Sequence, residues 1–140
     1  MKRRLLALLF GVLLLAIEMH AQAQIVVIAN PNVAVASITK AEMHDIFTGA
    51  STSLKDNLQV IPVLLKQGPV QEEFLNLYIG KSDNGFRAGW RGILFSGQGM
   101  MPKTLDSEAA VVEYVSHTPG AIGYIGRSTP HEGVISLTVR

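Results

Sequence analysis

The sequence predicts a single α/β domain in which a mixed sheet is flanked by helices. Three observations support this fold class. Short runs of β-branched and other apolar residues occur near the start, in the middle and near the end of residues 24–140. Segments whose apolar residues have helical spacing separate these runs. Apolar residues make up 48% of the chain, which is enough for one core. Cysteine is absent, so a hydrophobic core must hold the fold without disulfides or thiolate–metal bonds. The predicted element order is β-α-β-α-α-α-β-β.

Four segments are predicted strands. Residues 24–29 (QIVVIA) form a nearly continuous apolar run, which is typical of a strand buried on both faces. Residues 58–65 are also strand-like, and Pro62 predicts an edge position because it cannot donate to a sheet ladder. The other two are a buried strand over residues 121–125 and an alternating, half-exposed strand over residues 134–139.

Four helices are predicted from their end signals. Thr39 and Glu42 fit a capping box for a helix over residues 40–48, which Gly49 ends. The other helices begin at Pro69, at Ser82 or Asp83, and after Asp106 or Ser107, and they end near Gly80, Ser96 and Thr118. Three glycines weaken the third helix and predict that another backbone packs closely against it: Gly85, Gly89 and Gly92.

Residues 1–23 resemble a cleavable signal peptide. Three basic residues precede an apolar run over residues 5–17, and Ala21-Gln22-Ala23 then provides a small-x-small cleavage site. The apolar run is too short for a permanent membrane anchor, which takes about 20 residues. We therefore expect cleavage near Ala23 and a domain over residues 24–140 that works in the periplasm or is secreted. The alternative is that residues 5–17 form an apolar first helix of the fold.

Charge excludes one class of partner. Residues 1–23 contain three of the 12 basic and one of the 11 acidic residues, so the remaining chain is close to neutral. Its Lys and Arg residues are scattered, which argues against nucleic acid as a partner. We therefore expect no nucleic-acid binding. We also expect no cofactor.

Two motifs resemble elements of the phosphate-binding proteins of ABC importers. Residues 45–49 (DIFTG) are similar to the Ile-Phe-x-Gly element of that family, and residues 118–124 (TPGAIGY) match seven consecutive positions of its Thr-Pro-Gly-Ala-Ile-Gly-Tyr element. Phe74 and Trp90 follow in the family's order, so the resemblance covers nearly all of residues 25–126. It implies one lobe of a type II periplasmic binding protein-like fold and a role in oxyanion uptake or sensing with an ABC transporter. Full members close two lobes on the anion, and this chain accounts for the second.

The resemblance is weakest at the anion cradle. The family carries Arg-x-Asp-Gly-Ser-Gly-Thr before a Phe, and counting back from Phe74 places Lys66 at the Asp and Val70 at the Thr, so most of the groups that grip phosphate are missing. A helix N-terminus beside Lys66 can still attract an anion. The ligand-binding candidates are therefore Lys66, Gln67, Gly68, Val70 and Gln71. The alternative is an ordinary strand-to-helix turn, and Asp106-Ser107 is interpreted as a plain helix cap.

Catalytic and metal-binding patterns are absent from the sequence. His44, His117 and His131 lie in separate predicted elements, and neither a Gly-x-Ser-x-Gly elbow nor a phosphate-cradling Gly-x-x-x-x-Gly-Lys loop occurs. The sequence therefore predicts neither an enzyme nor a metal protein. Arg87 and Arg91, four residues apart on one helix, are candidates for binding a partner.

Two functions remain open. In the first, the domain binds phosphate or another small oxyanion, and a second copy or a partner protein completes the cleft. In the second, the lobe has lost its anion cradle and serves as a docking protein in an envelope assembly.

Overall fold

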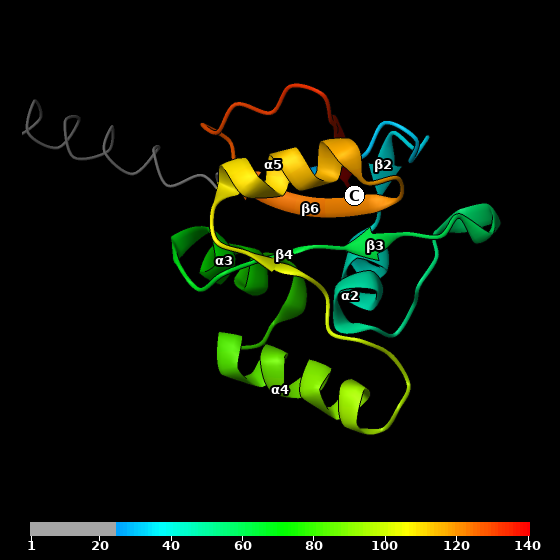
Figure 1. Ribbon diagram of the computed structural model, residues 1–140, viewed down its shortest axis with the longest axis vertical. Helices are drawn as coiled ribbons and strands as arrows, with labels where there is room; N and C mark the ends of the chain where they lie inside the picture. The colour runs from blue at the N-terminus through cyan, green and yellow to red at the C-terminus, as the bar shows by residue number, and fades with distance from the viewer. Residues whose placement is uncertain (1–24) are drawn as a thin grey trace, which may run out of the picture.

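The computed structural model describes residues 25–140, and the predicted signal peptide lies outside the described residues. The fold is mixed α/β, as predicted (Figure 1). The strands are β1 (Ile25–Ala29), β2 (Ser37–Ile38), β3 (Ile61–Pro62), β4 (Leu64–Leu65), β5 (Thr104–Leu105), β6 (Ala121–Gly126) and β7 (Ile135–Val139). The helices are α2 (Lys40–Thr48), the 3₁₀ turn η2 (Lys55–Asn57), α3 (Pro69–Phe74), the π-helix η3 (Leu75–Ile79), α4 (Asp83–Phe95) and α5 (Glu108–His117).

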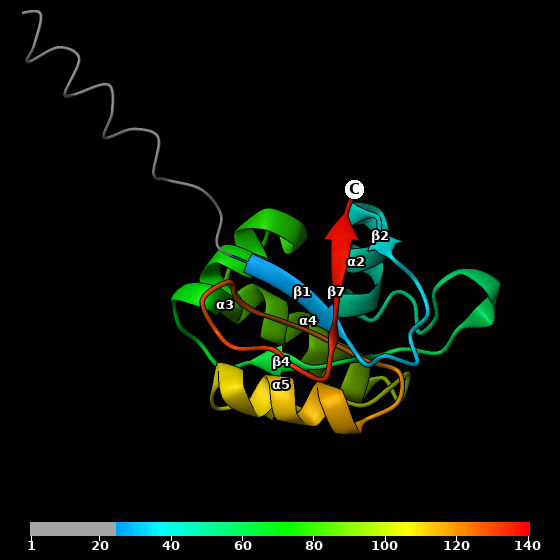
Figure 2. The same ribbon diagram turned by 90° about the horizontal axis from the view of Figure 1, so that it is seen from above.

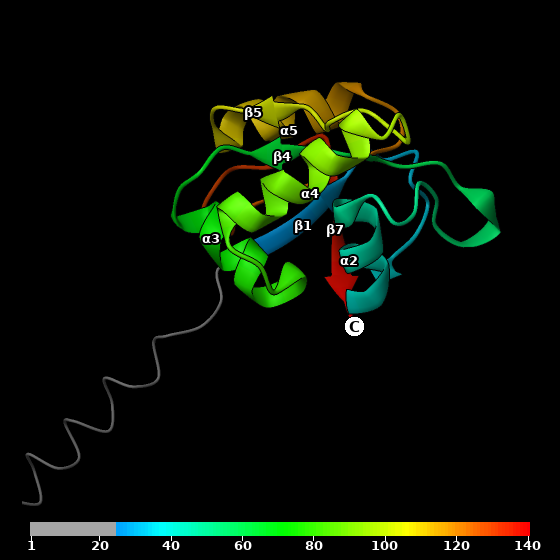
Figure 3. The same cartoon turned by 90° about the horizontal axis from the view of Figure 1, so that it is seen from below.

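The main sheet has the strand order β2-β7-β1-β6-β3, and β4 and β5 form a separate parallel pair. Strand β1 runs antiparallel to both β6 and β7, and Figure 2 shows β1 beside β7. The short edge strands β2 and β3 run parallel to their neighbours. All six residues of β6 are buried, which confirms the predicted buried strand. Helix α5 packs on one side of β6, α2 and α3 lie on its other side, and α4 lies beyond them (Figures 1 and 3).

All four predicted helix starts are confirmed, and α2, α4 and α5 begin with side-chain caps. Thr39 Oγ1 accepts a hydrogen bond from the Glu42 N–H at 3.0 Å, and the Glu42 carboxylate accepts one from the Thr39 N–H at 3.3 Å. Ser82 caps α4 and Ser107 caps α5. Each side chain satisfies a backbone donor that the first helical turn leaves free, so local chemistry fixes these helix starts.

The predicted strand over residues 58–65 is divided between two sheets. The Ile61 N–H bonds to Gly120 O, just before β6, and the Val63 N–H bonds to Ile122 O of β6, whereas the Leu64 N–H bonds to Lys103 O at 2.9 Å. The chain therefore exchanges β6 for β5 as its partner immediately after Val63. Strand β3 lies at the edge of the main sheet, as Pro62 predicts.

Three aromatic rings from three elements form the centre of the core. Phe74 of α3 stacks on Tyr124 of β6 with 3.7 Å between the ring centroids, and Phe47 of α2 meets Phe74 edge-on at 5.0 Å. All three residues have 0% relative exposure. This aromatic cluster joins the two segments that carry the family-like motifs to the helix between them.

The expectation that glycines in α4 allow close backbone packing is wrong for all three. A Cβ on Gly85 would meet side-chain atoms alone, Ser82 Oγ at 3.3 Å and Lys81 Cβ at 3.9 Å, and Gly89 and Gly92 are more open still. A Cβ built on either residue has no other atom within 4 Å, because both face open space. Helix α4 is instead held by Phe86 and Trp90, which are buried. No helix among residues 25–140 is long and apolar enough to cross a membrane.

We expect Gly89→Ala to raise the free energy of unfolding by roughly 0.5–1 kcal/mol, because alanine restricts the unfolded chain and no atom obstructs its methyl group. Urea denaturation measures this change. Gly49→Ala is the comparison, and it should lower the free energy of unfolding. Gly49 has φ +82°, and a Cβ there would lie 2.6 Å from Ile93 Cδ1. A loss of stability in Gly89→Ala would contradict the placement of this α4 face in open space.

Candidate functional site

The candidate site is built on the parallel pair of β4 and β5. Leu64 pairs with Thr104 and Leu65 pairs with Leu105, and the Lys66 N–H extends the ladder to Leu105 O at 3.0 Å. Each strand leads through a short turn into a helix, α3 after β4 and α5 after β5. Because the two strands run in the same direction, both helix N-termini emerge at the carboxyl edge of the pair, where α/β proteins commonly bind ligands.

A hollow of about 220 Å³ lies between these two helix starts. Its lining is formed by residues 65–70 on one side and residues 106–108 on the other. Four of the five predicted ligand-binding residues line it: Lys66, Gln67, Gly68 and Val70. Asp106 and Ser107, interpreted from the sequence as a plain cap, lie opposite them.

Backbone donors at the start of α3 are free to meet a ligand. Neither the Gly68 N–H nor the Val70 N–H donates a hydrogen bond to another residue in the range 25–140, and Pro69 has no N–H. At the start of α5, Ser107 Oγ already accepts the Ala110 N–H at 3.1 Å. The hollow therefore offers a small number of donors, fewer than a complete phosphate cradle.

The charges around the hollow are mixed. Lys66 is exposed and supplies one positive charge, whereas Asp106 and Glu108 supply two carboxylates. The Glu108 carboxylate is held in place, because its Oε1 accepts hydrogen bonds from the Gly126 N–H at 2.6 Å and from Thr129 Oγ1 at 2.8 Å. An oxyanion in the hollow would thus be attracted by Lys66 and repelled by a fixed carboxylate.

Gln71, the fifth predicted ligand-binding residue, points its side chain away from the hollow. It has 0% relative exposure, its Oε1 accepts a hydrogen bond from the Tyr124 hydroxyl, and its Nε2 donates to Asp83 Oδ1 at 3.2 Å. The side chain is therefore a structural element of the core behind the hollow. Its position one helical turn before the buried Phe74 is a sequence signal that places it on the buried face of α3.

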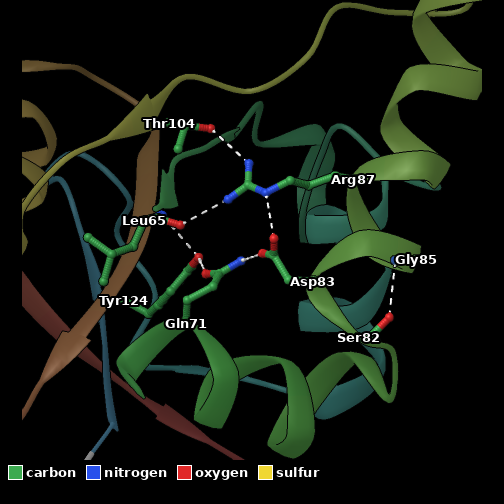
Figure 4. Close-up of polar contacts among 8 residues, drawn as sticks. All are labelled: Leu65, Gln71, Ser82, Asp83, Gly85, Arg87, Thr104 and Tyr124. Atoms are coloured by element: carbon green, nitrogen blue, oxygen red, sulfur yellow. Dashed lines mark hydrogen bonds and ion pairs between the residues drawn. The ribbon is translucent and has the colours of Figure 1, made fainter. Parts of the chain in front are cut away.

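These bonds belong to a closed ring that begins at the N–H and ends at the carbonyl of Leu65 (Figure 4). The Leu65 N–H donates to the Tyr124 hydroxyl at 3.0 Å, and from there the ring passes through Gln71 and Asp83. Arg87 closes it, with Nε donating to Asp83 Oδ2 at 3.0 Å and Nη2 donating to Leu65 O at 3.4 Å. The ring fixes the backbone immediately before Lys66 and joins it to α3, α4 and β6.

The ring depends on a neutral tyrosine. Burial raises the pKa of Tyr124 well above its ordinary value near 10, so the hydroxyl keeps its proton over the physiological range. A protonated hydroxyl can accept from the Leu65 N–H and donate to Gln71 at the same time. Each member of the ring therefore has a complementary partner.

The two arginines proposed to bind a partner have different environments. Arg87 is half-buried and its guanidinium is engaged by Asp83, the Leu65 carbonyl and Thr104 Oγ1. Arg91 is exposed on α4. Within residues 25–140, no group of three or more His, Asp or Glu side chains is placed to hold a metal ion.

No family model matches the chain, and no curated protein matches it. Three solved structures resemble it: a proposed phosphate ABC transporter substrate-binding protein with bound phosphate from Clostridium perfringens (21% identity, TM-score 0.65), PstS from Borrelia burgdorferi (18%, 0.63) and an ABC-type phosphate transport receptor from Vibrio cholerae (13%, 0.55). The matches cover 83–84% of this chain. The fold is therefore periplasmic binding protein-like, as the resemblance implies. The chain spans less than half of each of those proteins, 44–47% of their length.

The structure gives a physical reason for the family-like motif over residues 118–124. Gly120 has φ +82°, and a Cβ there would lie 3.1 Å from Gln59 O. A Cβ on Gly123 would lie 2.9 Å from Val111 Cγ1, and Tyr124 occupies the centre of the aromatic cluster. These positions serve a turn and the core, so the motif has a structural role in the fold.

Proposed function

We propose that the chain is an exported, periplasmic lobe of the binding protein type that meets phosphate or another small oxyanion in the hollow between α3 and α5, in uptake or sensing with an ABC transporter. The observation that carries the proposal is the convergence of two helix N-termini beside Lys66, where no hydrogen bond within residues 25–140 uses the N–H groups of Gly68 and Val70. The similar proteins support the ligand class, because two of the three are described as phosphate transport proteins and one of these was solved with phosphate bound.

Binding by this lobe alone is expected to be modest. A ligand held at one wall stays partly in water, and Glu108 places a carboxylate near it. We therefore expect dissociation constants of about 1 μM or weaker for a monomer, equivalent to about −8 kcal/mol or less favourable. A second copy or a partner protein that covers the hollow would exclude water and strengthen the same contacts.

Two matched substitutions test the hollow. Lys66→Gln removes the attracting charge and should weaken phosphate binding by about twofold to fivefold, whereas Glu108→Gln removes a repelling charge and should strengthen it by a similar factor. The glutamine keeps an oxygen that can accept the Gly126 N–H, so the fold is preserved. Isothermal titration calorimetry with phosphate, sulfate and molybdate, at constant ionic strength set with chloride, measures these changes.

Lys55→Gln serves as the control because Lys55 is an exposed lysine of η2 outside the hollow. It should leave the affinity unchanged. Opposite shifts for the two hollow variants support the proposal. Binding that no hollow variant alters would place the anion elsewhere, and tight phosphate binding by a monomer would contradict the modest affinity.

A docking role in an envelope assembly is the second candidate. The two carboxylates at the hollow and the missing cradle hydroxyls favour it, since both weaken anion binding. Absence of any oxyanion effect, together with recovery of one specific partner from envelope extract, would support docking. Recovery of no specific partner would count against it.

A further inference from the structure

A second concavity has no part in the proposed function. It is a groove of about 510 Å³ between α2, β3, α4 and the segment over residues 98–103. Sites for small molecules typically measure 300–1,000 Å³ and have mostly apolar walls with a few polar groups. The groove is within this range, and the hollow described above, at about 220 Å³, is below it.

The walls of the groove are apolar and adaptable. Trp90 and Ile93 of α4 form one side, and Ile61, Met100 and Met101 contribute flexible or branched side chains. Ile61 is 45% exposed and Met100 is 83% exposed, so water covers apolar surface that an occupant would bury. The Trp90 Nε1–H donates to Phe47 O at 2.9 Å, so the indole needs no polar partner from a ligand.

Lys103 is the one charged residue among those that line the groove, all of which lie in the described range. Its Nζ lies 5.0 Å from the centroid of the Tyr114 ring, which places the ammonium beside another lining residue. Residues 84–105 contain two arginines and this lysine and no Asp or Glu. The groove therefore combines an apolar interior with a positive charge that no lining carboxylate neutralises.

The geometry disfavours two macromolecular occupants. An added strand would need a donor on the open side of β3, but the N–H groups of Ile61 and Val63 point to the β6 side and Pro62, between them, has none. A two-fold pairing of copies would bring Lys103 of both chains into one interface without a lining carboxylate to neutralise them. A small anionic molecule has neither difficulty.

We propose that this groove binds an amphiphilic monoanion, in which an apolar chain or ring system fills the groove and a carboxylate or sulfonate lies at Lys103. The apolar walls supply the affinity, and the lysine selects the sign of the charge. Because the groove and the oxyanion hollow have separate lining residues, this proposal and the proposed function can fail independently.

Calorimetry with short fatty acids below their micelle concentrations tests the proposal. From hexanoate to octanoate to decanoate, the affinity should rise by about fourfold per methylene until the groove is full. Decyltrimethylammonium, a cation of the same chain length, should bind about threefold or more weakly than decanoate, and Lys103→Met should abolish that difference. Mass spectrometry checks that all variants have the same N-terminus, so that differences in affinity between them can be assigned to the groove.

A pair of substitutions locates the binding. Ile61→Glu places a carboxylate in the groove and should weaken decanoate binding by about tenfold or more. Leu77→Glu is the matched control, because Leu77 is similarly exposed, at 39%, but lies on η3 outside the groove. Thermal denaturation checks that both variants fold. The phosphate affinity of Ile61→Glu should equal that of the unmodified chain.

Three results would overturn the proposal: equal binding of the cationic and anionic amphiphiles, no decanoate binding to a folded monomer, or equal losses in Ile61→Glu and Leu77→Glu. A dimer in light scattering that Ile61→Glu converts to a monomer, together with absent decanoate binding, would instead assign the groove to an interface between copies. A decanoate affinity that follows the predicted order in chain length, charge and variants supports the proposal.

Discussion

Replacement of Phe74 by Ala is expected to lower the free energy of unfolding by about 3–5 kcal/mol, the largest effect of any single substitution proposed for this chain. Phe74 is fully buried, its ring stacks on Tyr124 with an interplanar angle of 4°, and it meets Phe47 edge-on. The substitution removes both ring contacts and leaves a cavity between a helix and the sheet. Domains of this size have about 5–15 kcal/mol of stability, so a large part would be lost.

Urea denaturation followed by circular dichroism measures the effect of Phe74→Ala. Phe95→Ala is the control, because Phe95 is 82% exposed and its loss should change stability by no more than about 0.5 kcal/mol. Phe74→Leu keeps most of the volume and should cost less than Phe74→Ala. A cost below about 1 kcal/mol for Phe74→Ala would contradict the aromatic cluster as the centre of the core.

The helices could be predicted from the sequence because their ends are set by neighbouring residues. Thr39 and Glu42 satisfy donors within one turn, and Ser82 and Ser107 act in the same way. Such signals are local, so a single sequence contains them. The buried strand β6 was equally clear from its apolar run.

The short strands depend on contacts between distant residues. Strands β2 and β5 have two residues each and were not predicted, since no periodicity can appear over that length. The division between β3 and β4 follows from the exchange of β6 for β5 as the partner after Val63. A run of apolar residues carries no information about which neighbour it pairs with.

The candidate site could be predicted only in part, because it too depends on contacts between distant residues. The loop from Lys66 to Val70 could be named from its place before a helix, but its proximity to Asp106 and Glu108 depends on the pairing of β4 with β5. Two features were accessible and missed. Gln71 shares a helical face with Phe74, and Arg87 lies four residues after Asp83, the spacing of a helical ion pair.

Tyr124→Phe is expected to lower the free energy of unfolding by about 2–3 kcal/mol, although it removes a single oxygen atom. The Leu65 N–H loses its acceptor and Gln71 Oε1 loses its donor, and both residues are buried. Leaving a buried polar group without a partner costs about 1–3 kcal/mol. Tyr114→Phe is the control, because no hydrogen bond of the Tyr114 hydroxyl occurs within residues 25–140.

The same variant changes how stability depends on alkaline pH. Burial raises the pKa of Tyr124 in the folded state above the value near 10 of the unfolded chain, so the unfolded state releases its proton first as the pH rises. Stability from this group is full below about pH 10 and is lost as the pH rises towards the folded pKa. Tyr124→Phe should show a shallower loss above pH 10, with a remainder from Tyr78, whose pKa burial also raises. An unchanged slope would contradict the buried position of the hydroxyl.

Oxyanion titration of Tyr124→Phe then separates two roles for the ring of hydrogen bonds. The Leu65 N–H and carbonyl are both held by the ring, and the next residue is Lys66 of the hollow. If the ring positions that loop, Tyr124→Phe weakens phosphate binding in addition to lowering stability, and Lys66→Gln has a smaller effect in this background than in the unmodified chain. If phosphate affinity is unchanged in the folded variant, the ring stabilises the core alone and the α3 turn keeps its geometry without it.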